Sequence, residues 1–339
     1  MMKTWLFILF FCCIAIRVMG QDPHFSQYYA APLYLNPAFA GTGNDHRFIA
    51  NYRNQWPNLA NGFVTYSFSY DYNIQDLRSG VGLLVGVDKA GSANLRSTSV
   101  GFLYSYKVQL SNKWMLTPGL YFGYGQRNID FNKLVFGDQL EFRNDGQVPT
   151  TDPTFGNLGS TAYFDFGAGL LMYNKTFWAG FSAQHINEPN RSLLGEESKI
   201  PVKTSVHAGV KIPLYNGVFK RDRISTLAPS FVYQNQGSFD QLDVGLHFLY
   251  EPVMIGVWYR GIPIQQNTKD NVSQDAAVLI LGLQFDQLEI AYSYDFTISE
   301  LGSVSGGAHE VSLKYLMALS FRNKTKKKDK FIPCPTFMK

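Results

Sequence analysis

The sequence predicts an all-β protein, a transmembrane antiparallel β-barrel of outer-membrane type with about 14 strands. Three observations support this class. Many stretches of about ten residues alternate between apolar and polar side chains. An export signal precedes them, and no later apolar run approaches the ~20 residues that a membrane-spanning helix needs. The chain also holds 27 Phe and 20 Tyr, which suit the lipid-facing surface of such a barrel.

Residues 1–20 have the pattern of a secretory signal peptide. Lys3 gives a positive charge, residues 4–16 are mostly apolar, and Gly20 permits cleavage before Gln21. An uncleaved anchor is the less favoured alternative, because the apolar run is too short for a comfortable span. Cleavage would leave Cys334 as the last remaining cysteine, so no intrachain disulfide is expected.

Alternation is the main evidence for strands. In residues 63–72, apolar and aromatic side chains share one parity and Thr, Ser and Asp share the other, as expected of a strand with one apolar face. The pattern predicts strands at residues 47–56, 63–72, 79–88, 96–110, 113–126, 161–173, 176–185, 202–212, 222–234, 240–250, 253–260, 276–285, 287–296 and 309–321. A soluble β-sandwich or propeller would also alternate, but it would not need such uniformly aromatic apolar faces.

Connections and charges agree with a barrel. Tight joints alternate with longer loops at 127–160, 186–201, 261–275 and 297–308, as in bacterial barrels with short periplasmic turns and long outer loops. The joint at 213–221 is an exception, being long where a short turn is due. Strand charges such as Arg53, Arg260 and Asp295 lie on the polar parity. This placement avoids the ~2–4 kcal/mol that a basic side chain costs on the lipid face.

Two segments are expected outside the barrel of residues 47–321. The first, 21–46, is predicted to be a periplasmic N-terminal segment that either plugs the lumen or docks a partner below it. It is too apolar to remain a free tail, and its candidate contact residues are Phe25, Gln27, Tyr28, Asn36 and Pro37. The second, 322–339, is a basic periplasmic tail, in which Lys326, Lys327 and Lys328 either contact an acidic partner or are simply solvated.

Several strings resemble one known family. They are Gln21 to Tyr29 (QDPHFSQYY), Pro32 to Gly41 (PLYLNPAFAG), Tyr52 to Pro57 (YRNQWP), His309 to Leu313 (HEVSL) and the late Cys334-Pro335. Together they resemble the PorP/SprF family over the whole mature chain. The resemblance implies an outer-membrane component of the type IX secretion system of Bacteroidota. It implies outer-membrane lipid, periplasmic secretion components and a secreted adhesin or other cargo protein as partners.

The residues themselves give no sign of catalysis. No pair of the six histidines has close metal-ligand spacing, and His207 and His247 are expected to be hydrogen-bonded side chains of the lumen. No nucleophile elbow or phosphate-binding loop is found. The sequence therefore predicts a non-catalytic protein without metal or cofactor and without a nucleic-acid partner. The function alternative is an outer-membrane channel or small-solute transporter.

Overall fold

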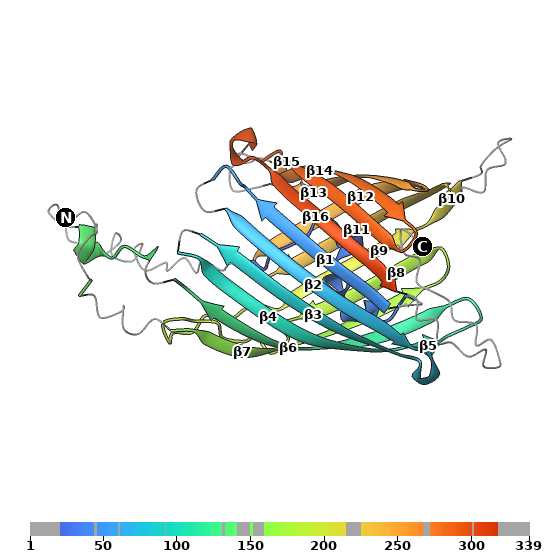
Figure 1. Ribbon diagram of the computed structural model, residues 1–339, viewed down its shortest axis with the longest axis horizontal. Helices are drawn as coiled ribbons and strands as arrows, with labels where there is room; N and C mark the ends of the chain where they lie inside the picture. Colours follow the sequence, from blue (N-terminus) through green and yellow to red (C-terminus); the bar gives the residue numbers. More distant parts are fainter. Residues whose placement is uncertain are drawn as a thin grey trace, which may run out of the picture.

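The computed structural model describes residues 21–43, 46–59, 62–91, 93–130, 133–140, 150–151, 159–214, 225–266, 272–299 and 302–317. Within these residues the fold is a β-barrel of tilted strands (Figure 1). Its long strands are β1 (His46–Gln55), β2 (Phe63–Ile74), β3 (Ser79–Ala90), β4 (Leu95–Tyr106), β6 (Met115–Asn128), β7 (Thr161–Tyr173), β8 (Phe177–Gln184), β9 (Lys203–Val210), β11 (Ser225–Gln236), β12 (Phe239–Tyr250), β13 (Val253–Gln266), β14 (Val272–Phe285), β15 (Leu288–Thr297) and β16 (Ala308–Met317).

The sheet closes on itself, so the expected 14-stranded antiparallel barrel is confirmed. The first and last strands pair, β1 with β16, from His46↔Met317 to Gln55↔Ala308. The remaining gap is closed where β9 pairs with β11. Two short strands, β5 (Val108–Gln109) and β10 (Ile212–Leu214), extend the wall locally. Closure matters because an open sheet edge in lipid would leave backbone polar groups without partners.

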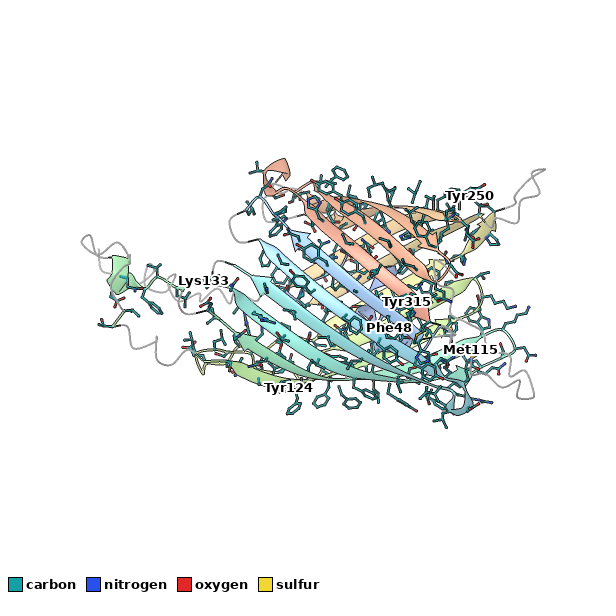
Figure 2. The ribbon with its side chains drawn as sticks, in the orientation of Figure 1. Phe48, Met115, Tyr124, Lys133, Tyr250 and Tyr315 are labelled. Carbon is teal, nitrogen blue, oxygen red and sulfur yellow. The ribbon has the colours of Figure 1, made fainter. Side chains whose placement is uncertain are left out.

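The side chains sort as the alternation predicts. In β2, Tyr66 and Phe68 are 44% and 43% exposed on the outer face, whereas Ser67, Ser69 and Asp71 are buried toward the lumen. Figure 2 shows the same outward display of aromatic rings, with Tyr124 and Tyr315 labelled. An apolar outer wall around a polar interior is the arrangement that a membrane barrel requires. None of the helices in the described part of the chain is long and apolar enough to cross a membrane.

Strand ends differ from the sequence prediction in a few places. The strand expected at 96–110 is divided into β4 and β5, and the one at 202–212 into β9 and β10. Strand β13 runs on to Gln266, past a register shift at Arg260/Gly261. Side-chain periodicity does not predict these breaks and shifts. On either side of an irregularity in the ladder, side chains still alternate between inward and outward positions. Pro118 and Pro229 both lie within strands, paired with Leu170 and Leu246.

The connections at the two ends of the barrel are unequal. The described residues of the connections 129–160, 185–202 and 298–307 lie at one end, together with the short 3₁₀ helices η5 (Gly137–Leu140) and η6 (Gly302–Ser305). The opposite end has close turns, including η3 (Gln75–Leu77) and the joint at 286–287. We call these the loop end and the turn end. By the rule for bacterial barrels we expect the loop end to face outward.

The segment of residues 21–43 lies inside the barrel, and we call it the lumenal segment (Figure 1). It consists of η1 (Tyr28–Ala30), the short helix α2 (Pro32–Leu35) and η2 (Pro37–Phe39), joined by extended residues. Asp22 bonds Gln236 beside the β11–β12 hairpin, at the loop end. Gly41 bonds Asp71 and Lys107, near the turn end where β1 begins. The segment therefore runs the length of the lumen instead of lying beneath the barrel, as a periplasmic placement would require.

Candidate functional site

Two buried arginines hold the lumenal segment in the half of the barrel nearer the loop end. Arg53 of β1 contacts Asp295 of β15 (Nη2–Oδ2, 2.8 Å) and Glu310 of β16 (Nη1–Oε2, 3.1 Å). Arg260 of β13 also reaches Asp295 (Nη1–Oδ2, 3.1 Å). The Ser26 hydroxyl lies between them, accepting from Arg53 Nη1 at 2.8 Å and Arg260 Nη2 at 2.9 Å and donating to Asp295 at 2.7 Å. We call these five residues the arginine cluster.

The backbone of the lumenal segment is also part of this cluster. The Ser26 and Gln27 amides donate to the two carboxylate oxygens of Glu310, at 2.7 and 3.0 Å. The Gln27 side chain, fully buried, donates to the Glu310 carbonyl and to Ser293, and it accepts from Ser312 at 2.6 Å. A carboxylate that accepts two adjacent backbone N–H groups fixes both the position and the direction of that peptide.

Tyr28 extends the contacts to β12. Its hydroxyl donates to Asp243 at 2.5 Å, and Asp243 in turn accepts from Arg260 Nε at 2.8 Å. The Tyr28 ring lies 5.8 Å from that of Trp258, within a buried apolar cluster that also includes Leu35. Tyr28 thus makes one polar and one apolar contact. Together they fix the position of the segment against two neighbouring strands, β12 and β13.

Asn36 anchors the segment to the opposite wall. Its Oδ1 accepts from the Ala38 amide at 2.9 Å, so it caps η2. Its Nδ2 lies within hydrogen-bond distance of the Phe181 carbonyl at 3.1 Å and of His207 Nε2 at 3.1 Å. Gly169 makes room for this amide, because a Cβ there would lie 2.0 Å from Asn36 Oδ1. Pro37 starts η2, where its missing N–H has no cost.

A third anchor lies toward the turn end. Arg47 and Asp71 form a two-bond ion pair (Nε–Oδ1 2.7 Å, Nη2–Oδ2 2.9 Å). Asp71 also accepts from the Gly41 amide at 2.8 Å, and Arg47 donates to the Phe39 carbonyl at 3.0 Å. The buried Lys107 amine donates to the Gly41 carbonyl. Charged side chains of the wall therefore satisfy the backbone groups that this end of the segment brings into the lumen.

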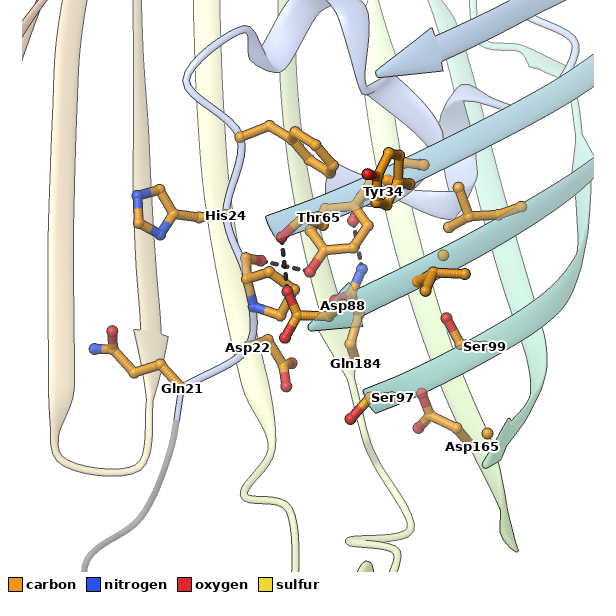
Figure 3. A pocket seen from close by; sticks show the side chains of 18 of the residues that line it. Gln21, Asp22, His24, Tyr34, Thr65, Asp88, Ser97, Ser99, Asp165 and Gln184 are labelled. Carbon is orange, nitrogen blue, oxygen red and sulfur yellow. Dashed lines mark hydrogen bonds between the residues drawn. The ribbon is translucent and has the colours of Figure 1, made fainter. Parts of the chain in front are cut away.

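The loop end holds an open vestibule of about 490 Å³, shown in Figure 3. His185 directly follows β8 and connects the floor of the vestibule to its wall. The His185 Nε2 lies 2.6 Å from Asp22, and its Nδ1 lies 3.0 Å from Asp165. Burial acts to lower the pKa of His185, but the two carboxylates outweigh it and raise that pKa to about 9. His185 is therefore charged at neutral pH, and it fixes the start of the lumenal segment. Asp88 accepts from Thr65 at 2.7 Å on the facing wall.

The five predicted contact residues all lie in the lumen, but Phe25 differs from the other four in what it contacts. Gln27, Tyr28, Asn36 and Pro37 all touch or adjoin the anchors described above. Phe25 is buried, but its contact is within the segment, an edge-to-face ring pair with Tyr34 at 5.2 Å. Gln21 lines the vestibule. Gly20 and the tail residues Lys326, Lys327 and Lys328 lie outside the described residues.

The sequence prediction missed the partners of these residues. Ser26, Glu310 and Asp243 were not among its candidates, although the strand charges were already placed on the lumen side. The lumen-facing position of these strand charges could have identified them as candidates, because buried charges need partners. His207 and His247 are buried as expected. Across the described ranges, no group of three His, Cys, Asp or Glu side chains is arranged to hold a metal ion.

A lipid-facing aromatic wall around a lumen filled by the chain's own N-terminal segment defines an integral outer-membrane barrel. The chain belongs to the PorP/SprF family, described as type IX secretion system membrane protein PorP/SprF, whose model matches residues 18–315. The resemblance drawn from the sequence is thereby confirmed, and the protein is a type IX secretion membrane component of the outer membrane. No curated protein matches the chain.

Several solved structures are similar to the chain at low identity. The Pseudomonas putida toluene transporter TodX is 11% identical, with a TM-score of 0.47 and coverage of 84% of this chain and 93% of that one. Acinetobacter baumannii Omp33 is 7% identical, with a TM-score of 0.41, covering 82% and 100%. BamA from Haemophilus ducreyi, lacking POTRA domains 1–3, is 10% identical, with a TM-score of 0.40, covering 80% and 70%.

Proposed function

We propose that this protein is a non-catalytic component that supports export or surface attachment of secreted proteins, and that its lumenal segment acts as a permanent plug. The occupied lumen is the observation that carries the proposal. Residues 25–28 are buried and bonded to five strands through Arg53, Arg260 and their carboxylate partners. A barrel filled in this way offers its two ends and its outer wall as surfaces, in place of a path for solutes.

The two ends suggest different partners. The loop end, facing outward by the loop-length rule, is suited to a secreted adhesin or another cargo protein. The turn end faces the periplasm and is suited to the secretion machinery, with the basic tail around Lys327 as a further candidate contact that falls outside the described residues. Outer-membrane lipid covers the aromatic wall. The family relationship supports the general role in secretion, whereas these contacts are our proposal.

Deletion in the native bacterium tests the export role. We expect the surface proteome to lose specific secreted proteins, which accumulate inside the cell, while unrelated outer-membrane barrels stay at normal abundance. Re-expression of the full chain from a plasmid should restore delivery. Unchanged surface delivery in the deletion strain would refute the proposal.

Planar-bilayer recording separates this role from the alternative, a channel or small-solute transporter. The purified wild-type chain should show no stable conductance, because residues 21–43 occupy the lumen. Removal of the arginine contacts, as in Arg53→Met, should produce intermittent openings as the segment loosens. Steady, solute-selective conductance of the wild type would favour the channel.

A further inference from the structure

Strand β7 has a free edge at the loop end. It pairs with β6 along its whole length, up to Arg127↔Thr161, but its ladder with β8 stops at Ala168↔Ala183. The chain just after β8 still reaches Phe166, because the Ile186 N–H donates to the Phe166 carbonyl at 3.0 Å. Residues 161–165 extend past that contact by roughly 15 Å at ~3.3 Å per residue. Figure 1 shows β6 and β7 together in this part of the wall. A free edge of this length is a template for another strand.

One side chain already imitates a neighbouring strand there. The Asn187 side-chain amide accepts from the Phe166 N–H at 3.1 Å and donates to the Phe164 carbonyl at 2.8 Å. Past that point the Phe164 N–H and both backbone groups of Ala162 face the same side. No partner for them lies among the described residues, and both residues are exposed. The edge is therefore capped at both backbone groups of Phe166 and at the Phe164 carbonyl, and it is open beyond them.

The backbone at the end of β8 is built to leave this edge open. His185 has φ +57° and Glu188 has φ +43°, left-handed conformations that are costly for residues other than glycine. The ion pairs of His185 with Asp22 and Asp165 hold that turn in place. After β8 the chain thus leaves the regular ladder and contacts β7 through the Ile186 amide and the Asn187 side chain. Strain of this kind concentrates at functional sites.

The free edge borders the vestibule. Tyr163 and Asp165 are lumen-side residues of the exposed part of β7, and both line the 490 Å³ cavity. An added strand would place alternate side chains outward beside Phe164, which is 67% exposed, and inward toward the cavity. The cavity volume is within the range of ligand sites in proteins.

The charged residues of the vestibule indicate which inward-pointing side chains an added strand should carry. Arg127 faces the vestibule from β6, and its Nε is buried without a hydrogen-bond partner in the described part of the chain. The vestibule carboxylates Asp22 and Asp165 are already engaged by His185, and Asp88 by Thr65. An acidic side chain on the incoming strand would give the Arg127 Nε the hydrogen-bond acceptor that it lacks among the described residues.

We propose that the vestibule and the free edge of β7 form one binding site for an extended peptide segment of a partner protein. The segment adds a strand beside Ala162 and Phe164 and directs an acidic side chain toward Arg127. Only an extended polypeptide supplies N–H and C=O groups at strand spacing together with alternating side chains. The inference deepens the proposed function, on which it rests, by giving the partner its site.

The test uses the purified full-length chain in detergent and two acetylated heptapeptides, Thr-Val-Thr-Glu-Thr-Val-Thr and its counterpart with Lys in place of Glu. Amide hydrogen exchange is measured at Ala162, Phe164 and Gly167. At a peptide concentration ten times Kd, exchange at Ala162 and Phe164 should slow about tenfold. Gly167, close to the end of β8, should not change. The Glu peptide should bind about tenfold more tightly than the Lys peptide.

Two variants sharpen the result. Arg127→Glu should reverse the preference between the peptides, and the matched control Lys113→Ala, at the exposed turn end, should leave it unchanged. Ala162→Pro removes an N–H that has no partner in the described part of the wall, so the barrel should fold while peptide protection is lost. Equal binding of both peptides, or no protection at either amide, would overturn the proposal. So would full protection of Ala162 and Phe164 before any peptide is added, since another part of the chain or a second copy would then occupy the edge.

Cell assays keep this inference apart from the export role. An Ala162→Pro strain that delivers surface proteins normally, while the deletion strain does not, would overturn the peptide site and leave the export role standing. Normal delivery in the deletion strain would overturn the export role, whatever the peptides do.

Discussion

Replacement of Arg53 by Met gives the most direct test of how the lumenal segment is held. The change removes two buried ion pairs and a hydrogen bond to Ser26, and it leaves Glu310 without its guanidinium. Loss of one partner of a buried pair costs about 3–5 kcal/mol. The barrel wall keeps its hydrogen bonds, so this cost falls on the attachment of residues 25–28. At about 1.4 kcal/mol per tenfold, the open population of the segment should rise roughly 10²- to 4 × 10³-fold.

Amide hydrogen exchange reads this change directly. The Ser26 and Gln27 amides donate to Glu310 in the wild type, so their exchange rates should increase by the same factor of roughly 10² to 4 × 10³ in Arg53→Met. The control Arg96→Met removes an equal charge from an exposed strand end and should change neither rate. Adding Glu310→Gln to Arg53→Met should recover part of the loss, because the unpaired carboxylate is gone. Unchanged exchange at Ser26 and Gln27 would refute the claim that the arginine cluster anchors the segment.

Further predictions concern the other anchors. His185 has a folded-state pKa raised from the usual 6.5 to about 9, so its stabilising ion pair is fully present below about 6.5 and is lost as the pH rises through about 9. The protection of amides near Asp22, taken relative to their intrinsic exchange rates at each pH, should fall over that window, and His185→Gln should remove this fall. Asn36→Leu should cost about 1–3 kcal/mol, because it leaves buried polar groups without a partner. The loss should lower the temperature at which the folded barrel changes mobility on gels, whereas an unchanged temperature would count against the anchor. Gly169→Ala should act similarly, since its Cβ would collide with the Asn36 amide.

Local sequence determined the wall of the barrel. Alternation in stretches such as 63–72 specifies the strands and their inward and outward faces, because a one-residue slip would turn every aromatic side chain into the lumen. The same parity is enough to assign Arg53, Arg260 and Asp295 to the lumen face. The apolar content of residues 21–46 indicates that they must be ordered against something.

Tertiary structure decided which of these residues meet. Ser26 and Glu310 are separated by 284 positions, and Tyr28 and Asp243 by 215, and no local periodicity connects residues so far apart. Barrel closure brings β1, β13, β15 and β16 around one point, and the lumenal segment supplies the hydroxyl and amides that fit there. The sequence also could not predict where the ladder between β7 and β8 ends, because a strand without a neighbour has the same alternation as a paired one. Local alternation determines which face a side chain occupies, whereas the closed sheet determines its partners across the lumen.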